Sequence, residues 1–276
     1  MRIAALQWDV RRSAVQANLA EAQGGLERAR EAGVELVLLP EMWATSFPDA
    51  GDDVASLVEQ ARDAASALNH CSARTGVDWA GSGFAPAPGG GALPVNRLEL
   101  FAGGEPLFAY DKVHLFGPTA EDRVFRAGAR LPQVVSWRGV RVSGAVCYDL
   151  RFPELTRAPF LGGAELLLVP AQWPSERAGA WRALVHGLAA SGQCVVLAAN
   201  RTGVERVARR GLELQFSGNS LCVDAAGVTL AEGRGEAGLV IAEFDPAAAR
   251  QMQQRIPVRR DRRPDVYVSG APREPD

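Results

Sequence analysis

Lysine is almost missing from this 276-residue sequence. Lysine and arginine together number 30, and Lys112 is the only lysine, which leaves 29 arginines. Lysine carries a compact charge whose pKa shifts readily, whereas arginine is a rigid fork that stays protonated. The lysine in AYDKVHLFG, Ala109–Gly117, is therefore either a remnant of codon usage or a position where a guanidinium would not serve.

An excess of one charge and a long apolar run are also missing. The formal net charge is −2 and the sequence pI is about 6.0, so neither nucleic acid nor an anionic membrane is an expected partner. No apolar run approaches the ~20 residues that span a bilayer. The first ten residues, MRIAALQWDV, become polar too soon for a signal peptide. These features predict a cytoplasmic protein.

Closely spaced cysteines are absent as well, because none of the four cysteines belongs to a C-x-x-C pair. Zinc ligands usually come in closely spaced pairs, and disulfide frameworks are uncommon in cytosolic chains of this size. We therefore expect neither a metal site nor disulfides. Cys71, Cys194 and Cys222 are predicted to be small buried hydrophobes, whereas Cys147 is placed differently.

Short apolar runs alternate with amphipathic stretches along the whole chain. ELVLLP (Glu35–Pro40) and ELLLVP (Glu165–Pro170) are apolar on both faces, which is typical of strands buried between two layers. Helical spacing of apolar residues covers 13–32, 52–74, 153–161 and 176–191. The pattern predicts an α/β fold with helices outside and sheets inside. No linker or repeat interrupts it, so we expect one domain over residues 1–276, ending in an extended basic tail.

Three reactive side chains follow predicted strands directly. Glu41, Lys112 and Cys147 each lie at or just beyond a strand end, which is where α/β enzymes tend to build sites. Cys147 also precedes a helix, and a helix N-terminus or a nearby ammonium lowers a thiol pKa. Each residue also has an ordinary explanation: Glu41 as a solvated loop acid, Lys112 as a surface lysine and Cys147 as a core thiol. Asp149 and Arg151, which follow Cys147, could likewise form a surface ion pair. The coincidence of all three favours a catalytic site.

Three segments resemble the signature blocks of the nitrilase, or carbon–nitrogen hydrolase, superfamily. They are LPEMW (Leu39–Trp43), DKVHLF (Asp111–Phe116) and CYDLRFPE (Cys147–Glu154). The tail RIPVRRDRRPDVY (Arg255–Tyr267) is similar to that of the omega-amidase-like branch. The resemblance implies a four-layer αββα sandwich, a Glu–Lys–Cys triad without metal or organic cofactor, and assembly into a homodimer or a higher homo-oligomer.

The resemblance also assigns roles to individual residues. Glu41 would be the general base, Cys147 the nucleophile and Lys112 its electrostatic partner. The Lys112 ammonium and the Tyr148 backbone N–H would stabilise the oxyanion. Glu121 would be the family's second glutamate, or otherwise a solvated loop acid. With a carboxylate as base, His114 is left with a structural role.

The implied reaction is hydrolysis of a small carboxylated amide through a thioester, with release of ammonia, as in an omega-amidase acting on 2-oxoglutaramate. Alternatives are an N-carbamoyl amino acid hydrolase, an amidase of deaminated glutathione, or a catalytically silent scaffold of the same fold. The chain departs from the family where Ser191 replaces an acid that many members carry. The residues expected to wall the pocket or bind the substrate carboxylate are Trp43, Tyr148, Arg151, Trp173 and Arg201.

Overall fold

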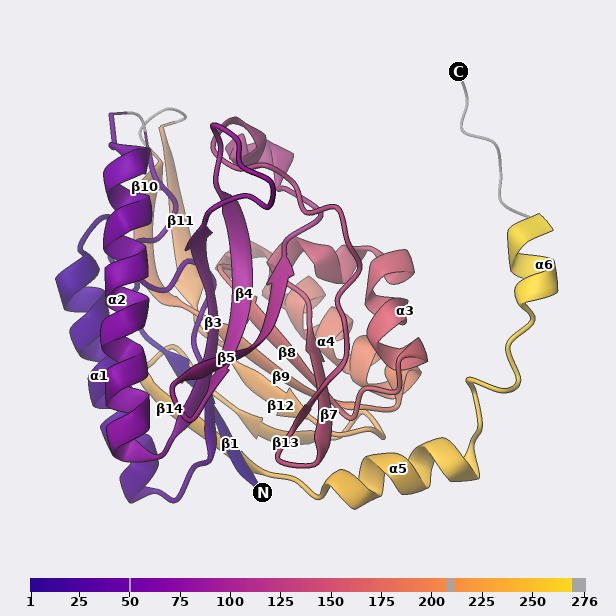
Figure 1. The fold of residues 1–276 in the computed structure, drawn as a ribbon. Coiled ribbons are helices and arrows are strands. Elements are labelled where there is room, and N and C mark those ends of the chain that lie inside the picture. Colours follow the sequence, from indigo (N-terminus) through magenta and orange to yellow (C-terminus); the bar gives the residue numbers. More distant parts are fainter. Residues whose placement is uncertain (50, 208–210, 270–276) are drawn as a thin grey trace.

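The computed structural model describes residues 1–49, 51–207 and 211–269, and its centre is a pair of six-stranded sheets (Figure 1). Strands β1, β2 and β3 of the first sheet are parallel, and the others pair antiparallel. The order in the first sheet is β14 (Gly238–Glu243), β1 (Arg2–Gln7), β2 (Leu36–Leu38), β3 (Asp78–Ala85), β4 (Val95–Ala102) and β5 (Glu105–Asp111).

The second sheet has a similar parallel centre, formed by β7, β8 and β9. Its outer strands pair antiparallel with this centre. The order is β13 (Thr229–Glu232), β12 (Leu221–Val223), β9 (Val195–Asn200), β8 (Leu166–Ala171), β7 (Val140–Gly144) and β6 (Val135–Trp137). Because parallel strands align their carboxyl ends, each sheet delivers the residues that follow its central strands to one edge.

Helices cover the outer face of each sheet, which confirms the predicted αββα sandwich. Helices α1 (Val15–Glu31) and α2 (Val54–Thr75) pack on the first sheet, and α3 (Pro153–Leu161) and α4 (Ala178–Gly192) on the second (Figure 1). Alternation along β1 shows why both strand faces are apolar. Ile3 belongs to the core between the sheets, and Ala4 to the core beneath α1 and α2.

Two features of the fold differ from the sequence prediction. A separate two-stranded hairpin, β10 (Thr202–Val207) and β11 (Leu212–Ser217), was missed. Its strands TGVERV and LELQFS mix polar and apolar residues, so no buried run marks them. The tail is not wholly extended either, because it contains the short helix α6 (Pro264–Ser269).

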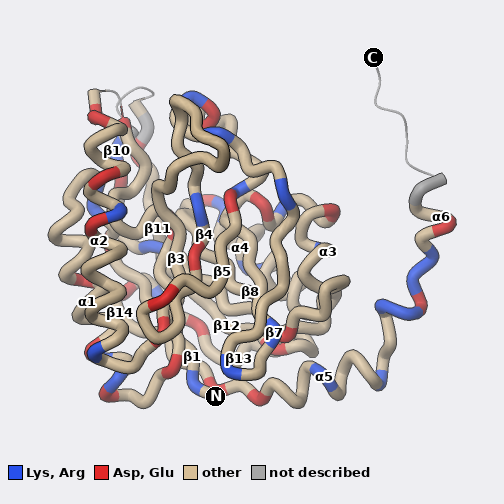
Figure 2. The backbone as a smooth tube through the Cα atoms, in the orientation of Figure 1, with Lys and Arg blue, Asp and Glu red and all other residues tan. Residues whose placement is uncertain are grey.

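The tail leaves the body of the molecule after α5 (Pro246–Arg255). The Asp245 side chain caps α5 by accepting a hydrogen bond from the Ala247 N–H at 2.9 Å. Between α5 and α6 the chain carries several arginines (Figure 2). Within the described ranges, no helix combines the length and apolar character needed to cross a membrane.

Candidate active site

Cys147 lies on a strained turn where the chain leaves β7. Its φ of 46° is in the left-handed region, which non-glycine residues seldom adopt and which often marks functional sites. Cys147 also begins a short 3₁₀ helix, Cys147–Arg151. The strand-to-helix turn predicted at this cysteine is therefore present, in a conformation that needs support from its neighbours.

Asp149 supplies that support from a fully buried position. Its carboxylate accepts hydrogen bonds from the Val146 N–H (3.1 Å), the Tyr110 hydroxyl (2.8 Å) and the His114 N–H (3.0 Å). The alternative of a surface ion pair between Asp149 and Arg151 is therefore wrong. Asp149 instead ties the segment around Lys112 to the turn that presents Cys147.

His114 is part of the same support. Its Nδ1 lies 2.8 Å from Asp149 Oδ1, and its ring stacks on Phe152 with centroids 3.6 Å apart. His114 is not among the residues that line the cavity beside Cys147. This position matches the structural role predicted for it.

Lys112 lies between two buried glutamates. Its Nζ is 2.8 Å from Glu41 Oε1 and 2.8 Å from each oxygen of Glu121. At most 1% of each of the three side chains is exposed. Glu121 also accepts the Phe116 N–H at 2.6 Å, so it is not a solvated loop acid. One ammonium thus contacts three carboxylate oxygens.

Gln172 is a site residue that the sequence prediction missed. Its backbone N–H donates to Glu41 Oε2 at 3.1 Å, and its side-chain Nε2 donates to the Glu41 carbonyl oxygen at 2.9 Å. Its own carbonyl oxygen lies 4.0 Å from Cys147 Sγ. The available signal was its place as the first residue after β8, the position that Lys112 has after β5.

Burial dominates the protonation of the site. It raises the pKa of Glu41, with the Lys112 ammonium acting in the opposite direction. Burial and then the Glu41 carboxylate raise the pKa of Cys147 well above its usual value. Burial alone would lower the pKa of Lys112, but Glu41 and Glu121 together raise it. The predicted lowering of the thiol pKa is therefore wrong, since the nearby ammonium does not offset burial.

Glu41, Lys112, Glu121 and Cys147 line one cavity of about 150 Å³. A dry protein cavity of about that volume holds benzene, so this space suits a small molecule. Aromatic side chains form much of its wall, namely Phe47, Phe116, Phe125, Tyr148, Trp173 and Phe216.

The structure separates the predicted substrate-binding residues into two groups. Tyr148, Arg151 and Trp173 line the cavity, but Trp43 and Arg201 do not. Trp43 is buried in the core beneath α1 and α2, where its ring lies 5.7 Å from that of Trp79. Arg201 is 1% exposed and forms ion pairs with Asp9 and with Glu205, of which only Glu205 lines the cavity. The prediction that Trp43 and Arg201 wall the pocket or bind the substrate is therefore wrong.

Arg177 lines the cavity and was not predicted. Its guanidinium lies 5.6 Å from the Phe116 ring, and that of Arg151 lies 5.0 Å from the Trp173 ring. Both side chains are exposed, and neither forms an ion pair within the described ranges. Arg12, the third cavity arginine, is paired with Asp49 and Glu205. Two uncompensated positive charges therefore remain where the cavity meets solvent.

The other cysteines and Ser191 lie away from this cavity. Cys71, Cys194 and Cys222 are free and buried, as predicted, and burial raises the pKa of Cys194 and of Cys222 to about 12. Ser191 is exposed near the end of α4, where its carbonyl oxygen accepts a hydrogen bond from Arg157 at 3.4 Å. Its substitution leaves the cavity wall unaltered.

Comparison with known families settles the relationship of the chain. The model of the carbon–nitrogen hydrolase family matches residues 2–254. The chain belongs to the carbon–nitrogen hydrolase family. It is a hydrolase of carbon–nitrogen bonds other than peptide bonds, as the three signature segments predict.

Curated members of the family with similar sequences are amidases. A 2-oxoglutaramate amidase of Bacillus subtilis (strain 168) is 32% identical over 267 residues, or 96% of this chain and 98% of the relative. An omega-amidase of Yersinia enterocolitica is 33% identical over 89% of this chain and 90% of its own length. A deaminated glutathione amidase of Synechocystis is 33% identical over 92% and 95%, respectively.

Solved structures of the family share the fold. An amidase from Nesterenkonia sp. AN1 superimposes with a TM-score of 0.85 at 31% identity, covering 98% of this chain and all of the other. A variant of that amidase carries the acetamide moiety of fluoroacetamide covalently on its active-site cysteine. A cysteine-dependent amidase chemistry is thus established within the fold.

Proposed function

We propose that Glu41, Lys112 and Cys147 are the catalytic triad of this amidase, with Glu121 as the second glutamate. Glu41 accepts the Cys147 proton as the sulfur attacks the amide carbonyl. The oxyanion is stabilised by the Lys112 ammonium and by the Tyr148 N–H, since the first N–H groups of a helical turn lack intrahelical partners. Support comes from the contacts that join the four side chains in one small cavity.

The remaining steps follow from the same groups. The Glu41 proton passes to the leaving nitrogen, the carbon–nitrogen bond breaks, ammonia departs, and a thioester stays on Cys147. Glu41 then takes a proton from a water molecule that attacks the thioester carbonyl. The carbon–sulfur bond breaks, the carboxylic acid leaves, and the thiol regains its proton. Burial raises the pKa of both Glu41 and Cys147, which favours proton transfer to Glu41 together with attack over a resting thiolate.

The single lysine suits the proposed role of Lys112. A tetrahedral ammonium can contact Glu41 and Glu121 and still direct a donor toward the oxyanion. A guanidinium is planar and larger, and its donors point outward in one plane. In a space where 1% of the lysine side chain is exposed, that shape does not fit without moving a glutamate.

We propose that the substrate is a small amide with a free carboxylate, as in omega-amidases, for example 2-oxoglutaramate. The observation that carries this proposal is the pair Arg151 and Arg177, both without an ion pair in the described ranges, on the wall of a cavity that ends at Cys147. Each guanidinium lies against an aromatic ring, which reduces the conformational freedom lost on binding a carboxylate. The name of the Bacillus relative agrees with this choice.

An N-carbamoyl amino acid is the second candidate substrate, because it also carries a carboxylate and is small. Deaminated glutathione is a larger carboxylated amide, and part of it would lie outside a cavity of about 150 Å³. Retention of Glu41, Lys112 and Cys147 on the wall of one cavity argues against a silent scaffold.

Ammonia release from a panel of substrates tests the proposal. The panel holds 2-oxoglutaramate, a neutral amide of the same chain length, an N-carbamoyl amino acid, deaminated glutathione and a nitrile. We expect the carboxylated monoamide to have the highest kcat/KM, and the Cys147→Ala variant provides the blank. Turnover of the carbamoyl compound or nitrile without turnover of 2-oxoglutaramate would reject the substrate and keep the enzyme class.

Arg177→Ala provides a sharper test of the carboxylate site. One charge-assisted hydrogen bond contributes about 1.5–3 kcal/mol, so kcat/KM for the carboxylated amide should fall by about 10- to 100-fold. Turnover of the neutral amide should stay unchanged. Arg157→Ala is the matched control, because Arg157 also lies over an aromatic ring, Phe160, but does not line the cavity.

We propose a single catalytic domain that forms a cytoplasmic homodimer. The tail supports a partner subunit, because it leaves the body and exposes Ile256 and Tyr267, which are 55% and 54% accessible. Sedimentation across a range of protein concentrations should give the mass of a dimer, whereas a monomer at every concentration would reject it.

A further inference from the structure

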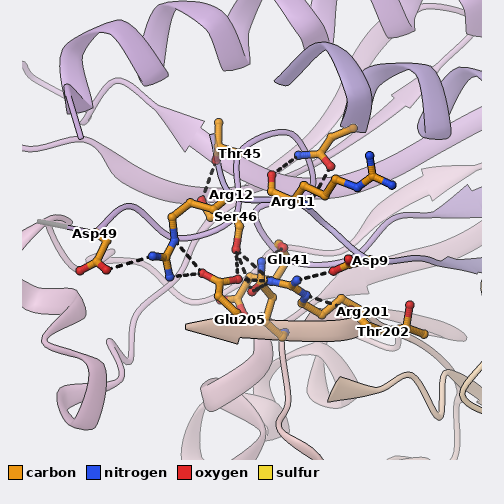
Figure 3. A network of polar contacts seen from close by, with 12 residues as sticks. Asp9, Arg11, Arg12, Glu41, Thr45, Ser46, Asp49, Arg201, Thr202 and Glu205 are labelled. Carbon is orange, nitrogen blue, oxygen red and sulfur yellow. Dashed lines mark hydrogen bonds and ion pairs between the residues drawn. The ribbon is translucent and has the colours of Figure 1, made fainter. Parts of the chain in front are cut away.

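Arg201 is a buried cation with an unusually full set of partners. It lies directly after β9, and its side chain is 1% exposed. Figure 3 shows the network around it. The guanidinium donates to five acceptors: Thr202 O at 3.2 Å, Ser46 Oγ at 3.1 Å, Gln172 Oε1 at 3.2 Å, Asp9 Oδ1 at 2.8 Å, and Glu205 Oε2.

Gln172 connects this network to the proposed base. Its Oε1 accepts from Arg201 at 3.2 Å. The Ser46 hydroxyl lies 3.2 Å from the same Oε1 and 2.7 Å from Glu205 Oε2, so its one hydrogen lies between the two acceptors. The Nε2 of the same amide donates to the Glu41 carbonyl oxygen, and the Gln172 backbone N–H donates to Glu41 Oε2. Both ends of the side chain are thereby fixed, one by Arg201 and Ser46 and the other by the backbone of Glu41.

The same residue also faces the nucleophile, because the Gln172 carbonyl oxygen is 4.0 Å from Cys147 Sγ. A displacement of the Gln172 peptide would therefore move a donor on the base and an acceptor near the thiol together. Arg201 and Ser46 do not themselves line the cavity. Any effect they have on turnover must pass through a neighbour.

We propose that Arg201 is a positioning residue, which holds Gln172 so that the Gln172 peptide fixes Glu41 against Cys147. This inference rests on the proposed role of Glu41 as general base. It gives a function to a residue that was predicted from sequence to bind the substrate.

The acids around Arg201 make this anchor rigid. Asp9 precedes α1, Glu205 lies on β10, and Glu205 also pairs with Arg12, which in turn pairs with Asp49 (Figure 3). Arg12 and Arg201 thus join three separate stretches of the chain, those of Asp9, Asp49 and Glu205. Because fully satisfied buried polar networks restrict a structure to one arrangement, the network also holds the β10–β11 hairpin as a wall of the cavity.

Three variants test the proposal. Arg201→Lys keeps the charge and removes the fork, Arg201→Met removes both, and Ser46→Ala removes the hydroxyl that contacts Gln172 Oε1 and Glu205 Oε2. Arg206→Met is the matched control, because Arg206 forms an exposed ion pair with Glu213 on the same hairpin. Each variant is checked for folding by circular dichroism, and Ser46→Ala decides the question if the Arg201 variants do not fold.

Misplacement of a catalytic group by about 1 Å can cost about 100-fold. We expect kcat to fall by about that factor in both Arg201 variants, and about tenfold in Ser46→Ala, where one neutral hydrogen bond is lost. KM should change less than about threefold in each variant, because neither substituted residue lines the cavity and Arg12 still pairs with Glu205. Arg206→Met should match wild type.

The pH profile separates positioning from a simple charge effect. The charged groups that face Glu41 are Lys112 and Glu121, with the Cys147 thiol beside them, and the variants leave all three intact. A weakened Gln172 N–H donor raises the Glu41 pKa, so the acid limb of kcat/KM should move to higher pH equally in Arg201→Lys and Arg201→Met. A shift in Arg201→Met alone would show a long-range charge effect and overturn positioning.

Two reference measurements keep this inference distinct from the proposed function. Full activity in Glu41→Gln would reject the base itself. If Glu41→Gln is inactive but both folded Arg201 variants and Ser46→Ala turn over like wild type, only the role of Arg201 is rejected.

Discussion

Replacing Lys112 with Met should reveal how strongly one ammonium stabilises two buried carboxylates. Methionine keeps the length of the side chain but leaves Glu41 and Glu121 without their shared cation. Two like charges so close, with at most 1% of either side chain exposed, cannot both stay ionised. The folded variant should therefore hold one more proton than wild type.

The cost of that proton can be worked out. A carboxylic acid of ordinary pKa 4.5 costs about 3.4 kcal/mol to keep protonated at pH 7 and about 0.7 kcal/mol at pH 5, at about 1.36 kcal/mol per unit. Lost hydrogen bonds add roughly 1–2 kcal/mol at either pH. The total of about 5 kcal/mol at pH 7 agrees with the ~3–5 kcal/mol lost when one partner of a buried pair is removed.

The sign follows from proton linkage. The unfolded chain releases this proton above pH 4.5, whereas the folded variant retains it, so stability relative to wild type falls as pH rises. Urea unfolding at pH 5, 6 and 7, followed by tryptophan fluorescence, measures the difference. Arg206→Met, which breaks an exposed ion pair, should cost below about 1 kcal/mol throughout. A Lys112→Met loss that is independent of pH, or below about 1 kcal/mol at pH 7, would refute this reasoning.

Further predictions concern activity. Cys147→Ala should abolish turnover with thermal stability near that of wild type; residual activity of about a tenth would exclude Cys147 as nucleophile. Lys112→Arg should be nearly inactive in the ammonia assay, and wild-type kinetics would return the lysine to codon usage. Because Glu41 must be ionised to act and burial raises its pKa, kcat/KM should fall as pH drops through a value above 4.5; an acid limb at or below 4.5 would contradict this. Iodoacetamide, itself a small amide, should label Cys147 before the other three cysteines, as read by mass spectrometry, because Cys147 is the one of the four that lines the cavity with Glu41; uniform slow labelling would favour a silent scaffold.

Much of the fold was predictable because its strands are unambiguous. Runs apolar on both faces required layers on either side, and the structure places Ile3 and Ala4 of one strand in two different cores. The β10–β11 hairpin was not predictable on these terms. It stands apart from both main sheets, so its residues carry no two-sided apolar signal.

The site divides along similar lines. Glu41, Lys112 and Cys147 were found because each reactive group follows a strand. Trp43 follows Glu41 just as closely, yet its ring turns into the core against Trp79. The direction of a side chain past a strand end depends on packing that spacing does not encode. Arg177 was missed because one arginine does not stand out in a chain so rich in arginine. Gln172 was missed because an amide side chain is neither an acid, a base nor a nucleophile, although its place after β8 matches that of Lys112 after β5.

The site is divided between the two sheets of the sandwich. Glu41 and Lys112 follow strands β2 and β5 of the first sheet, whereas Cys147 and Gln172 follow β7 and β8 of the second. Neither half holds both the proposed nucleophile and its proposed base. A molecule is therefore active only when its two sheets have packed together in the native arrangement. The rate at which activity returns during refolding measures the rate of this packing step.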